Sequence, residues 1–299
     1  MLSVIGMAKN VGKTTVLNYL VSKLTDYRLI LTSIGRDGED TDIVTNTKKP
    51  RIYVPDGSVI ITAEGLLGLS DITVEVLATT GYGTPMGKVV VVRALSAGFV
   101  QLGGPSMVSQ LEELLLGVGS DGAVLPRRLA DCCFAFAAAD SKVIIDGAIS
   151  RKSLASPRLS DAAILCTGAS LSPNENVVVA ETKHAVDILT LPAVSDADTI
   201  YVSGVVSDRK LMDLLTSGTA KAGMQIVADD PSKIFISAAT FGRLIARKVD
   251  LRVRDPINLV AVTVNPVSPR GMTLDSALFL EKMQAAVDVP VFDVVKHPF

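Results

Sequence analysis

Tryptophan is absent from this chain of 299 residues, and aromatic residues make up only 4% of it. Side chains that could stack on the bases of single-stranded nucleic acid are therefore scarce. The chain also has no excess of one charge, because 29 basic and 31 acidic residues leave a net charge of −2. Without a basic surplus to attract phosphate backbones, we expect no nucleic-acid partner.

Cysteine is rare as well, with only Cys132, Cys133 and Cys166. Two of them are adjacent and no Cys-x-x-Cys pair occurs, which argues against a disulfide framework and against a zinc site. No apolar run reaches the ~20 residues that cross a bilayer. Lys9 and Lys13 interrupt the first apolar stretch, which does not fit a signal peptide. We therefore expect a cytoplasmic protein with no membrane contact.

Hydrophobic residues make up 48% of the chain, which is enough to form a folded core. An apolar strand over 1–5, a helix over 14–24 and a second strand over 27–34 follow one another as in a βαβ unit. The pattern predicts an α/β fold with a mostly parallel sheet and helices on both faces, in a single domain over 1–299. Further strands are predicted over 142–146, 162–167, 199–206, 225–227 and 259–264.

The stretch from about 48 to 104 has a different pattern. Short β-forming runs are separated by turn residues, for example Gly81-Tyr82-Gly83-Thr84-Pro85. This pattern predicts an antiparallel β-rich insertion on the core sheet. A helix over 106–116 is expected to follow it.

A glycine-containing loop joins the first strand to the first helix. Backbone N–H groups of such a loop, together with the positive end of the helix, converge on phosphate oxygens. Lys13 is placed to reach the β- and γ-phosphates, and the Thr14 hydroxyl is placed to bind Mg²⁺. Gly12 allows close approach of the backbone. The sequence thus predicts a site for ATP and Mg²⁺ made by Gly6, Lys9, Asn10, Val11, Gly12, Lys13, Thr14 and Thr15.

Such a site needs a carboxylate to hold the metal or to position the attacking water. Asp146 ends an apolar strand and is our first candidate for both roles, with an ordinary helix cap as the alternative. Asp37, in the acidic cluster after the second strand, is the second candidate, and a solvated loop is the alternative there. Asn265 ends a late strand and has an amide that can read a base, although Asn before Pro266 also suits a turn.

The loop resembles the Walker A loop of one group of P-loop NTPases. Five residues separate Gly6 from Gly12, and Val11 precedes Gly-Lys-Thr, as in dethiobiotin synthetase and the cobyrinic acid amidases. In dethiobiotin synthetase the strand that matches Asp146-Gly147 ends in Glu-Gly. That enzyme's Lys-Pro pair after the second strand is missing here. Ala8 stands where dimeric relatives carry a second lysine, and the resemblance leaves a homodimer open.

A narrower resemblance rests on the segments 34–39, 49–53, 146–148, 151–152, 155–157, 166–169, 264–266 and 268–269. They are similar to the P-loop subunit of the factor that reactivates the cobalamin-dependent lysine 5,6-aminomutase. This resemblance implies an ATPase that works with a partner ATPase and drives a conformational change in a client enzyme. The alternatives are an ATP-dependent ligase or kinase acting on a small carboxylate, and a nucleotide-sensing module with little turnover.

Overall fold

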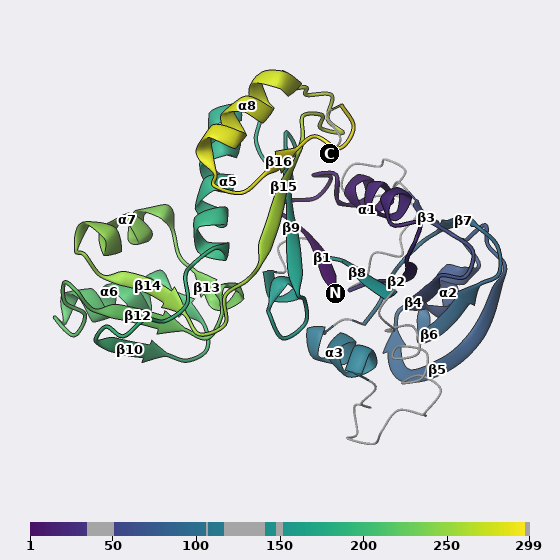
Figure 1. Ribbon diagram of the computed structural model, residues 1–299, viewed down its shortest axis with the longest axis horizontal. Coiled ribbons are helices and arrows are strands. Elements are labelled where there is room, and N and C mark those ends of the chain that lie inside the picture. The colour runs from purple at the N-terminus through teal and green to yellow at the C-terminus, as the bar shows by residue number, and fades with distance from the viewer. Residues whose placement is uncertain (35–50, 106, 117–140, 148–151, 297–299) are drawn as a thin grey trace.

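A computed structural model describes residues 1–34, 51–105, 107–116, 141–147 and 152–296 (Figure 1). A nine-stranded sheet lies at the centre of this part of the chain, in the order β16-β15-β9-β1-β8-β2-β4-β6-β5. All strands from β16 to β4 in this order pair in parallel, and β6 and β5 continue the sheet in antiparallel fashion. The strands are β1 Leu2–Gly6, β2 Arg28–Ser33, β4 Val59–Ala63, β5 Val74–Thr84, β6 Gly87–Ala94, β8 Ser141–Asp146, β9 Ala162–Gly168, β15 Leu259–Asn265 and β16 Val291–Phe292.

Helices cover both faces of this sheet. Helix α1 (Lys13–Lys23) buries Val16 and Leu17 in one hydrophobic cluster, together with Val4 of β1. The next residue of that strand, Ile5, belongs to the cluster on the opposite face, because successive side chains of a strand alternate. That second cluster contains buried residues of α3 (Val108–Leu116), α5 (Glu175–Leu189) and α8 (Ser276–Ala286). The predicted α/β class with helices on both faces is confirmed.

The β-rich stretch after residue 50 is divided between two sheets. The antiparallel part that we predicted is present as the hairpin of β5 and β6 and as a separate pair, β3 (Ile52–Val54) with β7 (Gly98–Val100). Strand β4, in contrast, pairs in parallel with β2 and belongs to the main sheet. All five of its side chains are buried, as expected of a central strand covered on both faces. The short helix α2 (Glu64–Leu67) follows it.

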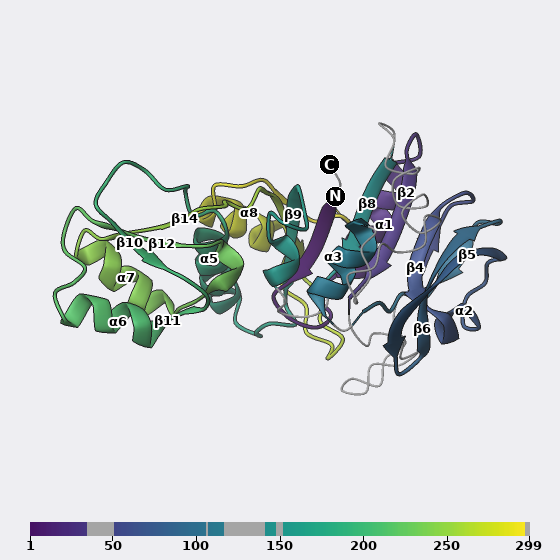
Figure 2. The ribbon, with the colours of Figure 1, turned by 90° about the horizontal axis from the view of Figure 1, so that it is seen from below.

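Residues 199–253 form a smaller unit with a sheet of its own. It contains β10 (Thr199–Val202), β12 (Gln225–Ala228) and β14 (Asp250–Val253), which run parallel in that order. Helices α6 (Asp208–Thr216) and α7 (Ala238–Ala246) and the short pair β11 (Val206–Ser207) and β13 (Ile234–Phe235) complete it. Figure 2 shows this small unit at one end of the molecule and the hairpin of β5 and β6 at the other.

The strand predicted over 199–206 is interrupted in this unit. Gly204 has a φ of 70°, a left-handed conformation that ends β10 before β11 begins. The unit has its own hydrophobic core, to which Leu211 and Leu215 of α6 and Ile226 of β12 contribute. Because Ile188 near the end of α5 lies in this core as well, the unit is packed onto the helix that leads into it.

A second contact joins the small unit to the main sheet. The short helix η1 (Lys152–Ala155), which follows β8 in the chain, packs against η2 (Pro231–Lys233) of the small unit. The hydroxyl of Ser156 donates to Asp230 Oδ2 at 3.4 Å, and Asp230 is only 5% exposed. The end of β8 is therefore connected through few residues to the small unit. No helix of the described ranges is long and apolar enough to span a membrane.

Candidate functional site

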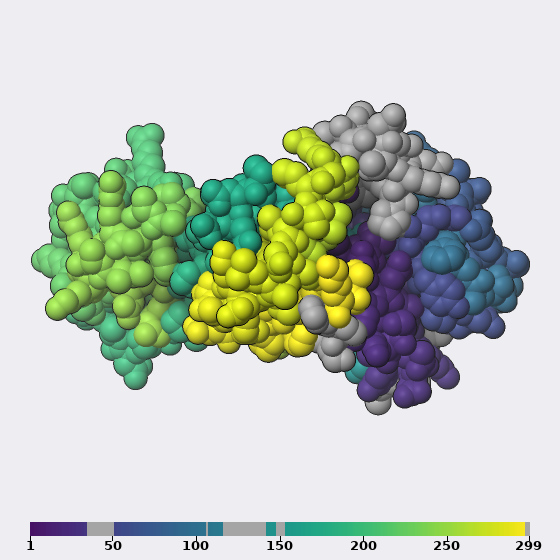
Figure 3. Space-filling model, turned by 90° about the horizontal axis from the view of Figure 1, so that it is seen from above, coloured from purple at the N-terminus to yellow at the C-terminus, as the bar shows by residue number. Residues whose placement is uncertain are grey.

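The predicted phosphate loop lies at the carboxyl end of β1. In the sheet β1 lies between β8 and β9, so the loop emerges where two neighbouring parallel strands also end. Ligands of open α/β sheets bind at this edge. The N–H group of Met7 donates to the carbonyl oxygen of Cys166 at 2.9 Å and ties the start of the loop to β9. In the space-filling view, α1 (purple) lies between the C-terminal segment (yellow) and the β-rich stretch (blue) (Figure 3).

Two residues of the loop have a left-handed backbone conformation. Asn10 has a φ of 59° and Gly12 a φ of 90°, and Gly12 is the N-cap residue of α1. The loop also folds back over Gly6, where a Cβ would lie 2.9 Å from Val11 Cγ2. Val11 itself is buried and anchors the loop in the core beneath α1. A side chain at Gly6 would collide with this anchor, and one at Gly12 would strain the backbone.

The N-terminus of α1 is not neutralised by its own residues. Its cap is a glycine, which has no side chain to accept from the first N–H groups, and no acidic residue lies in the first turn. The side chain of Lys13 bends back over the loop, where Nζ lies 3.4 Å from the carbonyl oxygen of Ala8. Helix N-termini attract anions through unpaired N–H groups and the helix dipole. A cation and a helix N-terminus thus meet at one loop.

Two residues distant in sequence support the left-handed turn. The carbonyl oxygen of Asn10 accepts from Ser170 Oγ at 3.1 Å and from Asn265 Nδ2 at 3.2 Å. The other side of the Asn265 amide is also occupied, because Oδ1 accepts from the N–H of Val267 at 3.1 Å. Asn265 is therefore adjacent to the loop between β1 and α1 and supports its backbone. Its predicted role in reading a base stays a prediction.

Ser170 was not among the candidates from sequence. It lies two residues after Gly168, the last residue of β9. A polar residue just after an apolar strand is the sequence feature that could have identified it as a candidate. The geometry also explains the glycine at 168, because a Cβ there would lie 2.2 Å from the carbonyl oxygen of Asn265. The ends of β9 and β15 can approach each other this closely only with a glycine at this position.

Asp146 and Lys13 lie near the same buried thiol. Asp146 is half-buried at the end of β8, in register with Val4 of β1. Burial raises the pKa of Cys166 to about 11; the positive charge of Lys13 acts to lower this pKa, and the negative charge of Asp146 acts to raise it. Both charges are thus close enough to act on one sulfur atom under the loop. The catalytic and metal-binding roles of Lys13 and Asp146 stay predictions.

The remaining candidates differ in their surroundings. Thr14 is half-buried in the first turn of α1, where Thr15 is exposed, and Lys9 is exposed on the loop. Asp37 lies outside the described residues. Within those residues, no group of three or more His, Cys, Asp or Glu side chains could hold a metal by itself. Thr14 and Asp146 still fit Mg²⁺, which usually takes one or two protein oxygens, phosphate oxygens and water.

Comparisons of the chain with protein-family models, with curated proteins and with solved structures found no match. Its function therefore has to be inferred from the geometry of the loop and from the residues around it.

Proposed function

We propose that this protein binds ATP with Mg²⁺ at the loop 6–15 and hydrolyses it to drive a conformational change in a partner protein. The observation that carries the proposal is the turn through Asn10 and Gly12, directly before an uncapped helix N-terminus. Consecutive N–H groups in such a turn form a concave anion site, and the helix dipole adds to it. Lys13 supplies the positive charge that a triphosphate needs.

Each neighbouring residue has a role in this proposal. Lys13 binds the β- and γ-phosphates, and the Thr14 hydroxyl binds Mg²⁺. Asp146 holds the metal, directly or through water, or positions the attacking water. The metal that Thr14 and Asp146 would hold would supply positive charge to offset the charge that develops during phosphoryl transfer. Ser170 and Asn265 keep the Asn10 carbonyl turned down into the protein, which leaves the N–H groups of the loop for the phosphates.

The connection between β8 and the small unit supports a switch. Asp146 ends β8, and η1 follows it in the chain and packs against η2 of the small unit. A ligand at Asp146 can shift the small unit only if it binds one arrangement more tightly than another. The γ-phosphate is a common source of such a difference, because it is present before hydrolysis and absent afterwards.

Binding of ATP and Mg²⁺ tests the proposal by isothermal titration. We expect Lys13→Ala to weaken binding at least about tenfold, because a charged hydrogen bond contributes roughly 1.5–3 kcal/mol. Lys23→Ala is the matched control, since Lys23 is an exposed lysine in the last turn of the same helix. A wild-type protein that binds no nucleotide, or equal affinities for the two variants, would contradict the proposal.

The client that we propose comes from the sequence resemblance alone. It is a cobalamin-dependent aminomutase, acted on together with a partner ATPase. Inactivated aminomutase would be incubated with fresh adenosylcobalamin, ATP, Mg²⁺, the partner and either wild-type protein or Lys13→Ala. Recovery only with wild type is the expected result. Turnover that depends instead on an added small carboxylic acid would favour the ligase or kinase alternative.

A further inference from the structure

The outer edge of β10 has free backbone groups. Within the described residues β10 pairs only with β12, and the carbonyl oxygen of Asp198 accepts from the N–H of Gln225 at 2.8 Å. Backbone groups of successive strand residues point to opposite sides. Ile200 and Val202 therefore point their backbone groups at β12 as Asp198 does, and Thr199 and Tyr201 point theirs outward.

The strand itself lacks the residues that usually protect a sheet edge, and the nearby charges come from other elements: Lys210 donates to the carbonyl oxygen of Ser203, and the Arg254 guanidinium lies 4.8 Å from the centre of the Tyr201 ring. Natural edge strands carry charged residues, proline or bulges that prevent pairing with another chain. The segment 199–205 reads Thr-Ile-Tyr-Val-Ser-Gly-Val and contains no charge and no proline. Tyr201 is 57% exposed and Val205 is 58% exposed. This edge thus has the features that favour the addition of a further strand.

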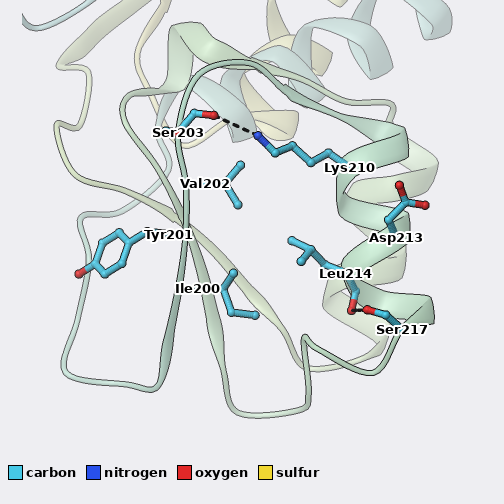
Figure 4. Close-up of a pocket in the computed structure, with 8 residues that line it drawn as sticks. All are labelled: Ile200, Tyr201, Val202, Ser203, Lys210, Asp213, Leu214 and Ser217. Carbon is cyan, nitrogen blue, oxygen red and sulfur yellow. Dashed lines mark hydrogen bonds between the residues drawn. The ribbon is translucent and has the colours of Figure 1, made fainter.

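A groove runs beside the same edge, between β10 and α6, with a volume of about 530 Å³. Its apolar floor is formed by Ile200, Val202 and Leu214. Figure 4 shows Ile200 and Val202 pointing towards the helix and Tyr201 pointing away from it. Lys210 lies at one end of the groove and donates from Nζ to the carbonyl oxygen of Ser203 at 3.0 Å (Figure 4).

We propose that this edge pairs with the same edge of a second copy of the chain, with the two β10 strands antiparallel about an axis at Tyr201. This register places Thr199 opposite the partner's Ser203, so the outward backbone groups of both strands face each other. The Ser203 carbonyl oxygen already accepts from Lys210, and its second lone pair accepts from the partner's Thr199 N–H in this dimer. It also places Ile200 opposite the partner's Val202, above the groove. The two Tyr201 rings meet on the other face, as a cross-strand aromatic pair.

The charges near β10 favour antiparallel pairing with a second copy over parallel pairing. By alternation, the side chain of Asp198 lies on the same sheet face as α6, from which Lys210 extends to the far end of β10. Antiparallel pairing brings Lys210 beside the partner's Asp198, twice by symmetry, whereas parallel pairing would bring two lysines together. Asp213 lies nearer the axis, and Arg209 at 3.9 Å offsets its charge.

The dimer is measured by analytical ultracentrifugation of the full chain without nucleotide. Because only a short strand and the groove are covered, we expect a dissociation constant of about 1–100 µM. Tyr201→Pro removes one outward N–H and leaves the ladder to β12 intact, and proline is tolerated on edge strands. We expect it to weaken the dimer at least about tenfold, while Tyr201→Phe leaves the dimer unchanged.

A charge exchange tests the orientation even if the proline variant does not fold. Asp198→Lys and Lys210→Asp should each weaken the dimer, and the double variant should recover it, because opposite charges again face each other. Circular dichroism checks that each variant is folded. A chain that stays monomeric at about 100 µM, or a dimer unaffected by Tyr201→Pro and by both single charge variants, would overturn the proposal. Binding of a different protein's strand at this edge by a monomeric chain would also overturn it.

Discussion

The amide Nδ2 of Asn265 donates to the carbonyl oxygen of Asn10 at 3.2 Å across 255 residues of sequence. Asn10 has a φ of 59°, a conformation that is uncommon for a residue other than glycine. Such a conformation costs roughly 1–3 kcal/mol and persists where the surrounding structure holds it. The end of β15, late in the chain, therefore helps to determine the shape of the first loop.

This relationship predicts a loss of nucleotide affinity in Asn265→Ala. The carbonyl oxygen of Asn10 would lose the hydrogen bond from Asn265 and keep the one from Ser170, and each such bond contributes about 0.5–1.5 kcal/mol. We expect the dissociation constant for ATP with Mg²⁺ to rise about three- to tenfold in calorimetry. Asn258→Ala is the control, because Asn258 precedes the same strand and bonds Asp161 at the opposite edge. Equal effects of the two variants would show that the support of the loop is irrelevant to binding.

Asp146→Asn should separate binding from turnover. The amide is similar in size, so ATP should remain bound, but the variant loses the negative charge that holds the metal or positions water. We expect ATP hydrolysis to fall by ~10²-fold or more, since loss of one positioned catalytic group commonly costs that much. Phosphate release is the measurement, and Asp187→Asn, at a carboxylate on α5 paired with Lys183, is the control. Unchanged turnover in Asp146→Asn would show that another carboxylate holds the metal or positions the water, and Asp37 is the next candidate.

The raised pKa of the buried Cys166 thiol predicts that the protein loses stability at alkaline pH. Its pKa is about 11 in the folded protein against an ordinary value of 9.0, so the folded state keeps the proton longer than the unfolded state. The stabilising contribution is complete below pH 9.0 and is lost as the pH rises through about 11. At about pH 10.5 the loss is about 2 kcal/mol relative to about pH 8.

Urea unfolding without nucleotide checks this at both pH values. Tyrosines and lysines titrate in the same range, so the informative quantity is the difference between the wild type and Cys166→Ala. The wild type should lose more free energy of unfolding than the variant between the two pH values. Parallel losses would mean that the thiol ionises equally easily in the folded and unfolded chains.

The predicted turn over 81–85 is mostly strand, because Gly81 to Thr84 belong to β5. The burial of Tyr82 near the end of β5 predicts that this end of the hairpin is structural. The Tyr82 ring is only 4% exposed, and its hydroxyl donates to Glu113 of α3. We expect Tyr82→Ala to lower the free energy of unfolding by about 3–5 kcal/mol, as for other buried aromatic rings. Tyr53→Ala, at a tyrosine that is 40% exposed, should cost less than half as much. Similar denaturation midpoints for these two variants would contradict the burial of Tyr82.

Patterns within short segments were sufficient to predict much of the fold and the loop. The predicted strand over 259–264 corresponds to β15 and the helix over 14–24 to α1, because each has a continuous or periodic apolar pattern of its own. Helix α5 was not predicted. Its Val177-Val178-Val179 run favours a strand by β-branching, while the Asn174 cap and the burial of Val178 against the sheet favour the helix.

The sequence alone determined the class of the fold and the location of the glycine-containing loop between β1 and α1, because Gly6, Gly12 and Lys13 are close together in the chain and the pattern that they form is local. The tertiary structure alone decided that β1 lies between β8 and β9, that 199–253 forms a separate sheet, and that Ser170 and Asn265 support Asn10. These relationships join segments up to 255 residues apart. They depend on which apolar faces pack together. The pattern of a single strand does not specify its neighbour, because several strands of this chain have similar composition.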